Sequence, residues 1–172
     1  MNELDSITGY IPGLIGRIAE LHAKYYSKNW NFEQYFEIQV ATKLSDFILN
    51  YDEEKECVFS LSIEGEIEGS ISICRSDEVN TAQLRWFIIS DKLRGTGAGN
   101  YLLNQVMIFL ERSNYNKVFL WTFKGLTSAR HLYDKYGFKL TEERIGIQWG
   151  PVITEQRLEA EIKTDMKPSQ TF

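Results

Sequence analysis

The chain carries the run Arg94-Gly95-Thr96-Gly97-Ala98-Gly99 between an apolar segment, residues 84–89, and a segment of helical character that begins at Asn100. Glycines at alternate positions let the backbone turn tightly and bring successive N–H groups toward an anion. The helix that follows leaves its first N–H groups unpaired and partly positive. With the permanent cation of Arg94 beside them, these features predict a phosphate-binding loop between a strand and a helix.

The spacing of the glycines limits which class of phosphate-containing ligand the loop can bind. A dinucleotide fold requires G-x-G-x-x-G and a nucleoside triphosphate loop requires G-x-x-x-x-G-K-[ST], and neither string is present. The pattern that is present, R-x-x-G-x-G, resembles the acetyl-coenzyme A loop of the GNAT superfamily of N-acetyltransferases. In that family the loop amides hold the coenzyme A pyrophosphate. The resemblance therefore implies acetyl-coenzyme A as co-substrate.

A second element lies downstream, after the apolar run at residues 118–122. Residues 129–138 match the family pattern A-x-x-x-Y-x-x-x-G-F, with Ala129, Tyr133 and Gly137 in its fixed positions. The apolar residues recur at helical spacing, and Gly137 stands where a helix takes its left-handed C-terminal cap. Many relatives carry Asn three residues before the alanine, to hydrogen-bond the pantetheine arm. Here Leu126 occupies that position, and Thr127 or Ser128 is the expected substitute.

The resemblance implies a set of residues that bind the co-substrate. They comprise the end of the strand, the glycine loop with the first helical residue, and two residues of the downstream helix. In chain order they are Phe87, Ile88, Ile89, Arg94, Gly95, Thr96, Gly97, Ala98, Gly99, Asn100, Ser128 and Tyr133.

Three residues are candidates for catalysis. Tyr133 matches the family position of the acid that protonates the departing thiolate, and the alternative is an aromatic residue packed under its helix. Glu37 follows Phe36 in a pair that recurs in similar modules, although a carboxylate on a half-exposed helix is most often only solvated. His22 lies one residue from the apolar stripe at Leu21, where a lone histidine is more often structural than basic.

The resemblance extends toward both ends of the chain. His22 and short stretches at 13–16, 25–26, 36–37, 40–41, 148–150 and 154–156 are similar to the acetyltransferase module that some bacterial proteins carry behind a MarR-type DNA-binding domain. No such DNA-binding domain is expected in this sequence. On the strand before the glycine loop, Arg85 and Trp86 either line the acceptor pocket or cover the sheet.

Composition limits the class of protein. With 172 residues, 43% of them hydrophobic, we expect one domain over residues 1–162 and a polar tail at 163–172. A net charge of −5 disfavours a nucleic-acid partner. The sequence shows neither a leader nor an apolar run of the roughly 20 residues that span a bilayer, which predicts a cytoplasmic protein without a membrane partner. Cys57 and Cys74 are expected as reduced core thiols, and no metal site is expected.

Hydrophobic periodicity predicts the order of the elements. Two amphipathic helices, 14–25 and 32–47, are separated at the polar run 27–29. A hairpin at 57–63 and 67–74, the strand ending at 89, a helix to 111, a strand at 118–122 and a short helix follow. Two strands, 138–149 and 152–162, close the chain around Pro151. This order predicts an α+β fold with a GNAT-like mixed, mostly antiparallel twisted sheet flanked by about four helices.

The expected function is transfer of an acetyl group from acetyl-coenzyme A to a primary amine of a small molecule or peptide by direct attack. The alternative is a non-catalytic module that binds or senses an acyl-coenzyme A. A nucleotide-binding protein is a third class, but it would need a phosphate lysine or a ribose carboxylate that the sequence lacks. The partners are then acetyl-coenzyme A and an amine, in a monomer or homodimer. No motif identifies the amine.

Overall fold

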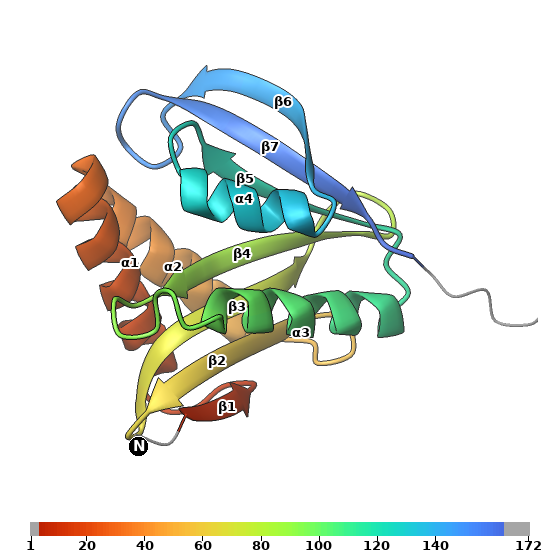
Figure 1. The fold of residues 1–172 in the computed structure, drawn as a ribbon, viewed down its shortest axis with the longest axis horizontal. Coiled ribbons are helices and arrows are strands. Elements are labelled where there is room, and N and C mark those ends of the chain that lie inside the picture. The colour runs from red at the N-terminus through yellow and green to blue at the C-terminus, as the bar shows by residue number, and fades with distance from the viewer. Residues whose placement is uncertain (1–3, 164–172) are drawn as a thin grey trace, which may run out of the picture.

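The computed structural model describes residues 4–163, which form one seven-stranded sheet and four helices (Figure 1). The strands are β1 Leu4–Thr8, β2 Cys57–Ile63, β3 Glu66–Arg75, β4 Thr81–Ile89, β5 Lys117–Phe123, β6 Lys139–Gly146 and β7 Ile153–Glu161. The helices are α1 Leu14–Trp30, α2 Gln34–Leu49, α3 Ala98–Arg112 and α4 Thr127–Lys135. None of these helices is long and apolar enough to cross a membrane.

The sheet has the strand order β1-β2-β3-β4-β5-β7-β6. All neighbouring strands are antiparallel except β4 and β5, which run parallel and are connected through α3. Parallel neighbours need such a crossover, whereas the antiparallel pairs can be joined by short turns. The mixed, mostly antiparallel α+β fold predicted from the sequence is therefore confirmed.

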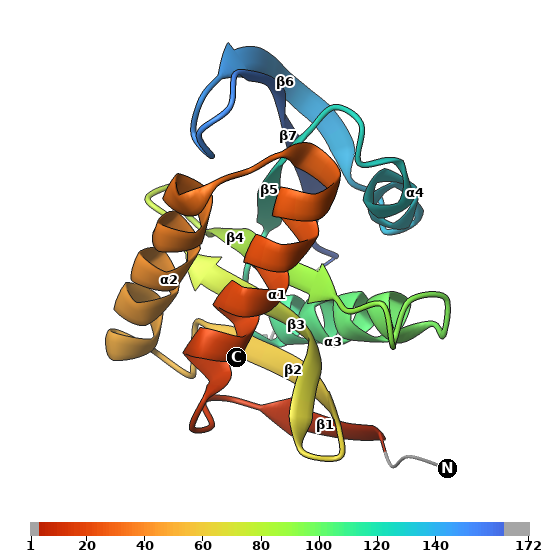
Figure 2. The same cartoon turned by 90° about the vertical axis from the view of Figure 1, so that its left-hand side faces the viewer.

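Helices cover both faces of the sheet. Figure 1 shows α3 and α4 in front of the sheet, and Figure 2 shows α1 and α2 on its other side. The α3 side is closed by Leu102, Leu103, Val106 and Leu110, which lie on one face of the helix and have no exposed surface. A second apolar cluster, which includes Leu14 of α1, lies between α1, α2 and the opposite face of the sheet.

Several element boundaries differ from the sequence predictions. The polar run 27–29 does not separate the first two helices, because its side chains lie on the exposed side of α1, which continues to Trp30. The chain turns at Asn31, whose φ of 55° lies in the left-handed region that Asn tolerates. The closing strands are shorter than expected, since residues 147–152 form the turn between them. Strand β1 was not predicted, because its five residues are mostly exposed.

The C-terminal end of α4 has the predicted cap. Gly137 has a φ of 82°, its N–H donates to the carbonyl of Asp134, and the N–H of Phe138 donates to the carbonyl of Tyr133. This pair of bonds is the Schellman arrangement. This turn places the side chain of Phe138 in the hydrophobic core.

Cys57 and Cys74 are buried and unbridged, as predicted. Most of the predicted tail, residues 164–172, lies outside the described residues.

Candidate active site

The site begins where β4 and β5 separate. The two strands pair over only three residues each, Thr81–Gln83 with Lys117–Phe119, although both continue well beyond this register. The gap belongs to a cavity of about 430 Å³. Its walls come from both strands, the glycine loop, α4, α1 and α2. A cavity that opens between parallel strands beside a helix N-terminus can hold an extended ligand with an anionic end.

A β-bulge in β4 accompanies this separation. Ser70 pairs with Ile88 and Ser72 pairs with Arg85, so Trp86 and Phe87 together stand opposite the single residue between the two serines. Trp86 has a φ of 48°, a left-handed value that is rare for a bulky side chain. Bulges bend the strand that carries them and occur often beside active sites. The bulge lies at the level where β5 has already left β4.

The glycine loop leads directly into α3. Gly97 is the N-cap residue with a φ of 91°, and no side chain caps the helix start. A Cβ atom on Gly97 would meet no protein atom within 4 Å, so this part of the backbone is open to a ligand. At Gly99 a Cβ atom would lie 3.4 Å from Leu132 and 3.5 Å from Phe87, which are ordinary van der Waals distances. Gly97, with its positive φ, is therefore the glycine that shapes the open part of the loop, whereas Gly99 lies packed against its neighbours.

The structure brings most of the predicted co-substrate residues to one cavity. Those that line it are Phe87, Ile88, Ile89, Arg94, Gly95, Gly97, Ala98, Gly99, Ser128 and Tyr133. Thr96 and Asn100 are not in its lining. The Thr96 hydroxyl donates to the carbonyl of Leu93, and the Asn100 side-chain oxygen accepts from the ammonium of Lys135 at 2.7 Å. These two residues thus hold the loop and join α3 to α4.

Tyr133 lies in the cavity wall and is 6% exposed. Its ring packs against those of Phe87 and Phe138, with centroids 6.1 and 5.6 Å away. Burial, reinforced by the nearby Tyr26, raises the pKa of the phenol well above its ordinary value of 10. The group is therefore protonated across the physiological range. Packing explains the ring, while a protonated hydroxyl on the cavity wall can donate a hydrogen bond or a proton.

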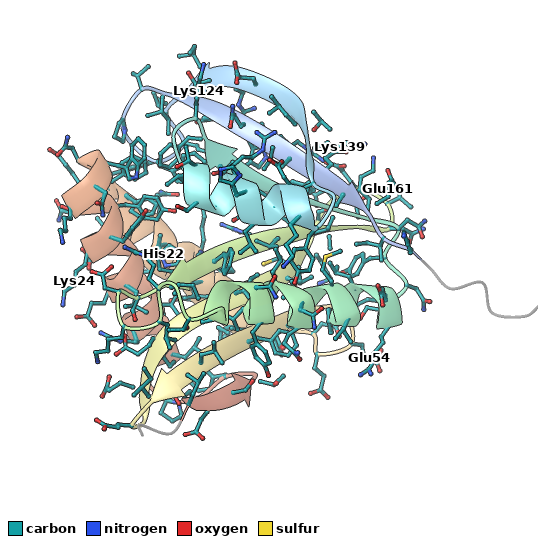
Figure 3. All side chains as sticks on the ribbon, viewed as in Figure 1. His22, Lys24, Glu54, Lys124, Lys139 and Glu161 are labelled. Carbon is teal, nitrogen blue, oxygen red and sulfur yellow. The ribbon has the colours of Figure 1, made fainter. Side chains whose placement is uncertain are left out.

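His22 lies on α1, where Figure 3 labels it. It belongs to the buried stripe of the helix, four residues after Ile18. Its Nδ1 atom lies 2.8 Å from the carbonyl oxygen of Ile18. Because a carbonyl only accepts, Nδ1 carries the proton and Nε2 keeps its lone pair. Burial lowers the pKa of His22 to about 4. The side chain lines the cavity as a neutral imidazole with one acceptor nitrogen.

Glu37 does not reach the cavity. It is exposed on α2, whereas its neighbour Phe36 is buried and lines the cavity. Successive residues of a helix point about 100° apart, so only one of the pair can face the sheet. The structure therefore brings together Tyr133 and His22, but not Glu37.

Sequence reasoning did not identify the aromatic wall around the end of β5. Phe123 at the end of β5 contacts Trp30, Phe32 and Trp149, with ring centroids 4.8, 5.4 and 5.7 Å away. Tyr26 joins the same wall at 6.0 Å from Phe123. The dense aromatic residues near the junction of α1 and α2 were the available signal, but they do not indicate which strand end they meet.

Comparison with known sequences identifies the family of this chain. The model of the acetyltransferase (GNAT) family matches residues 15–138. N-acetylaspartate synthetase of Danio rerio is 25% identical over 122 residues, which are 70% of this chain and 43% of that protein. The human N-acetylaspartate synthetase is 26% identical over 122 residues, 70% of this chain and 40% of that protein. The chain thus spans less than half the length of these curated relatives.

Solved structures share the fold. A GNAT-family acetyltransferase of Staphylococcus aureus superposes with a TM-score of 0.75 at 18% identity, covering 94% of this chain and all of that one. An Acinetobacter baylyi protein described as an acetyltransferase gives 0.77 at 13% identity, covering 99% and 98%. A Salmonella typhimurium protein, solved with its cofactor acetyl-coenzyme A, gives 0.71 at 14% identity, covering 99% and 100%.

Proposed function

Because the chain belongs to the acetyltransferase (GNAT) family, we propose that it transfers an acetyl group from acetyl-coenzyme A to a primary amine. The observation that carries the proposal is one cavity, bounded by the β4–β5 gap, the open glycine loop and the buried Tyr133. The curated relatives are named for N-acetylation, which supports a nitrogen acceptor rather than an oxygen.

The residues of the loop fit the pyrophosphate end of acetyl-coenzyme A. Gly95 and Gly97, with φ of 80° and 91°, leave the amides before α3 uncovered by side chains. The uncapped start of α3 adds unpaired N–H groups and the positive end of the helix dipole. Arg94 lies at the cavity edge, with its guanidinium paired to Asp91 at 2.7 Å and 5.1 Å from the ring of Tyr25. The pantetheine arm would then lie in the gap between β4 and β5.

When bound, acetyl-coenzyme A supplies the acetyl group as a thioester. The amine nitrogen forms a bond to the acetyl carbon, the carbon–sulfur bond breaks, the amine loses a proton and the thiolate gains one. Tyr133 is the donor to the thiolate, since its phenol is protonated and lines the cavity. An unneutralised thiolate would be costly in this partly buried site.

His22 acts on the amine side of the cavity. Its Nε2 atom can accept a hydrogen bond from the amine and orient it. A pKa of about 4 makes His22 too weak a base to hold the amine's proton for long at pH 7. The proton therefore passes on to solvent, and His22 serves mainly to position the amine.

The test is release of coenzyme A thiol from acetyl-coenzyme A in the presence of a panel of amines, with the acetylated product identified by mass spectrometry. Amine-dependent thiol release supports the proposal. Tight binding of acetyl-coenzyme A without turnover on any amine would instead favour the sensing module. A single domain and the likeness to modules that accompany MarR-type domains stay predictions from the sequence.

A further inference from the structure

Arg85 is a cation on the cavity wall, and no carboxylate of the described residues pairs with it. It lies on β4 at the bulge, and its guanidinium carbon is 4.2 Å from the centre of the Trp86 ring. Across residues 4–163 no acidic side chain pairs with it and no carbonyl accepts a hydrogen bond from it. Its five N–H donors are therefore available to a molecule in the cavity.

Arg85 differs from the other arginines of this structure that lie over aromatic rings. Three further guanidiniums lie over aromatic rings, those of Arg94, Arg144 and Arg157. Each of these three also pairs with a carboxylate, at 2.7 to 2.9 Å. Stacking on a ring thus accompanies an ion pair at these sites. At Arg85 the ring is present, but the described part of the chain supplies no carboxylate.

The surroundings of Arg85 add positive charge. Burial and the nearby Arg85 guanidinium lower the pKa of Lys43 on α2, and burial lowers the pKa of Arg85 itself. Lys43 also has no ion pair among the described residues. A partly buried guanidinium next to a second cation costs free energy unless an anion accompanies it.

We infer that the amine acceptor carries a carboxylate, which Arg85 binds, so that the substrate class is amino acids or closely related amino carboxylates. This inference rests on the proposed acetyl transfer. The planar guanidinium offers a pair of parallel N–H groups that match a carboxylate. Arg85 and Tyr133 line the same cavity, as do the apolar side chains of Phe36, Val40 and Trp149. The amine can therefore face the reacting centre while the carboxylate stays at β4.

The experiment compares each of a set of L-amino acids with its α-amide and with the amine that lacks the carboxyl group. The readout is the ratio of kcat/KM for carboxylate over amide, measured separately in wild type and in Arg85→Met, Arg85→Lys and Arg112→Met. Because both kcat/KM values are measured on the same protein, their ratio does not depend on the fraction of that protein that is folded. Arg112 is the control, because it is exposed at the end of α3 and removing it changes the net charge equally.

We expect wild type and Arg112→Met to prefer the carboxylate by about 10²-fold or more. Arg85→Met should lose most of this preference, and Arg85→Lys should retain part of it. A wild-type ratio near one, or an equal loss for acid and amide in Arg85→Met, would overturn the inference while leaving acetyl transfer intact. Amino phosphonates and amino acids with a side-chain carboxylate distinguish the position and type of the anion.

Binding provides a readout that does not need turnover. Calorimetry with N-acetyl amino acids and their amides measures the same preference on the product side. We expect the acid to bind wild type at least about ten-fold more tightly than the amide, and Arg85→Met to abolish the difference. Equal binding of the two in wild type would reject the inference even if no amine in the panel were acetylated.

Discussion

The Nδ1 atom of His22 lies 2.8 Å from the carbonyl oxygen of Ile18, one helical turn earlier on α1. This bond fixes the neutral tautomer and leaves Nε2 free on the cavity side of a side chain that is only 5% exposed. Protonation would place a positive charge on the ring in a buried site, which is why the pKa falls from 6.5 to about 4.

That shift predicts a pH dependence of stability. In the unfolded chain His22 takes up a proton below about pH 6.5, whereas in the folded chain it does so only near pH 4. The unfolded state therefore binds more protons in this window, and the free energy of unfolding falls as the pH drops, by up to about 3 kcal/mol in total. Urea unfolding at pH 7, 5.5 and 4 should show this contribution in wild type and not in His22→Gln. His131→Gln, which alters an exposed histidine on α4, should keep the wild-type slope.

Mutation distinguishes the two residues that the sequence offered for the amine side, His22 and Glu37. His22→Ala should lower kcat/KM for the amine by roughly ten-fold or more, because the acceptor at Nε2 is lost. Glu37→Gln should leave it within about two-fold, since Glu37 is exposed outside the cavity. Steady-state kinetics at pH 7 with a cognate amine measures both. Wild-type rates for His22→Ala would remove the imidazole from the mechanism.

Gly97→Val should abolish binding of acetyl-coenzyme A. The new side chain meets no protein atom but occupies the space before α3 and forces a β-branched residue to a φ of 91°. Gly65→Val is the matched control, because Gly65 has a φ of 81°, is equally free of neighbours and lies in the β2–β3 turn. Both variants should lose about 1–2 kcal/mol of stability. Calorimetric titration should show binding only in the control, and wild-type affinity in folded Gly97→Val would disprove the loop assignment.

Tyr133→Phe should slow acetyl transfer by roughly ten-fold or more and leave folding nearly unchanged. The hydroxyl makes no hydrogen bond to residues 4–163, so its removal orphans no buried group there. Single-turnover rates are the proper measurement, because slow product release can hide the step in kcat. Tyr136→Phe is the control at the C-terminal end of the same helix, since the Tyr136 hydroxyl donates to the carbonyl of Asn100 at 3.0 Å and its loss should affect stability rather than chemistry. An unchanged single-turnover rate would assign Tyr133 to packing alone.

The sequence alone was sufficient for features that depend on neighbouring residues. The glycine run, the α4 pattern with Gly137 and the apolar repeats of α2 and α3 correspond to a turn, a cap and two helix faces in the structure. These depend on backbone conformations and side-chain spacings within a few residues, which the order of amino acids specifies directly. The parallel crossover also followed, because a strand, a helix and a strand in succession leave few other arrangements.

Only the tertiary structure decided which of these residues meet. The gap between β4 and β5, the left-handed Trp86 and the aromatic wall at Phe123 depend on contacts between distant segments. Packing against the sheet placed His22 inside and Glu37 outside, although both stand beside apolar residues in the sequence. The same packing left Arg85 on the cavity wall with no carboxylate partner among residues 4–163, because whether a charge is paired depends on what every other element brings within about 4 Å of it.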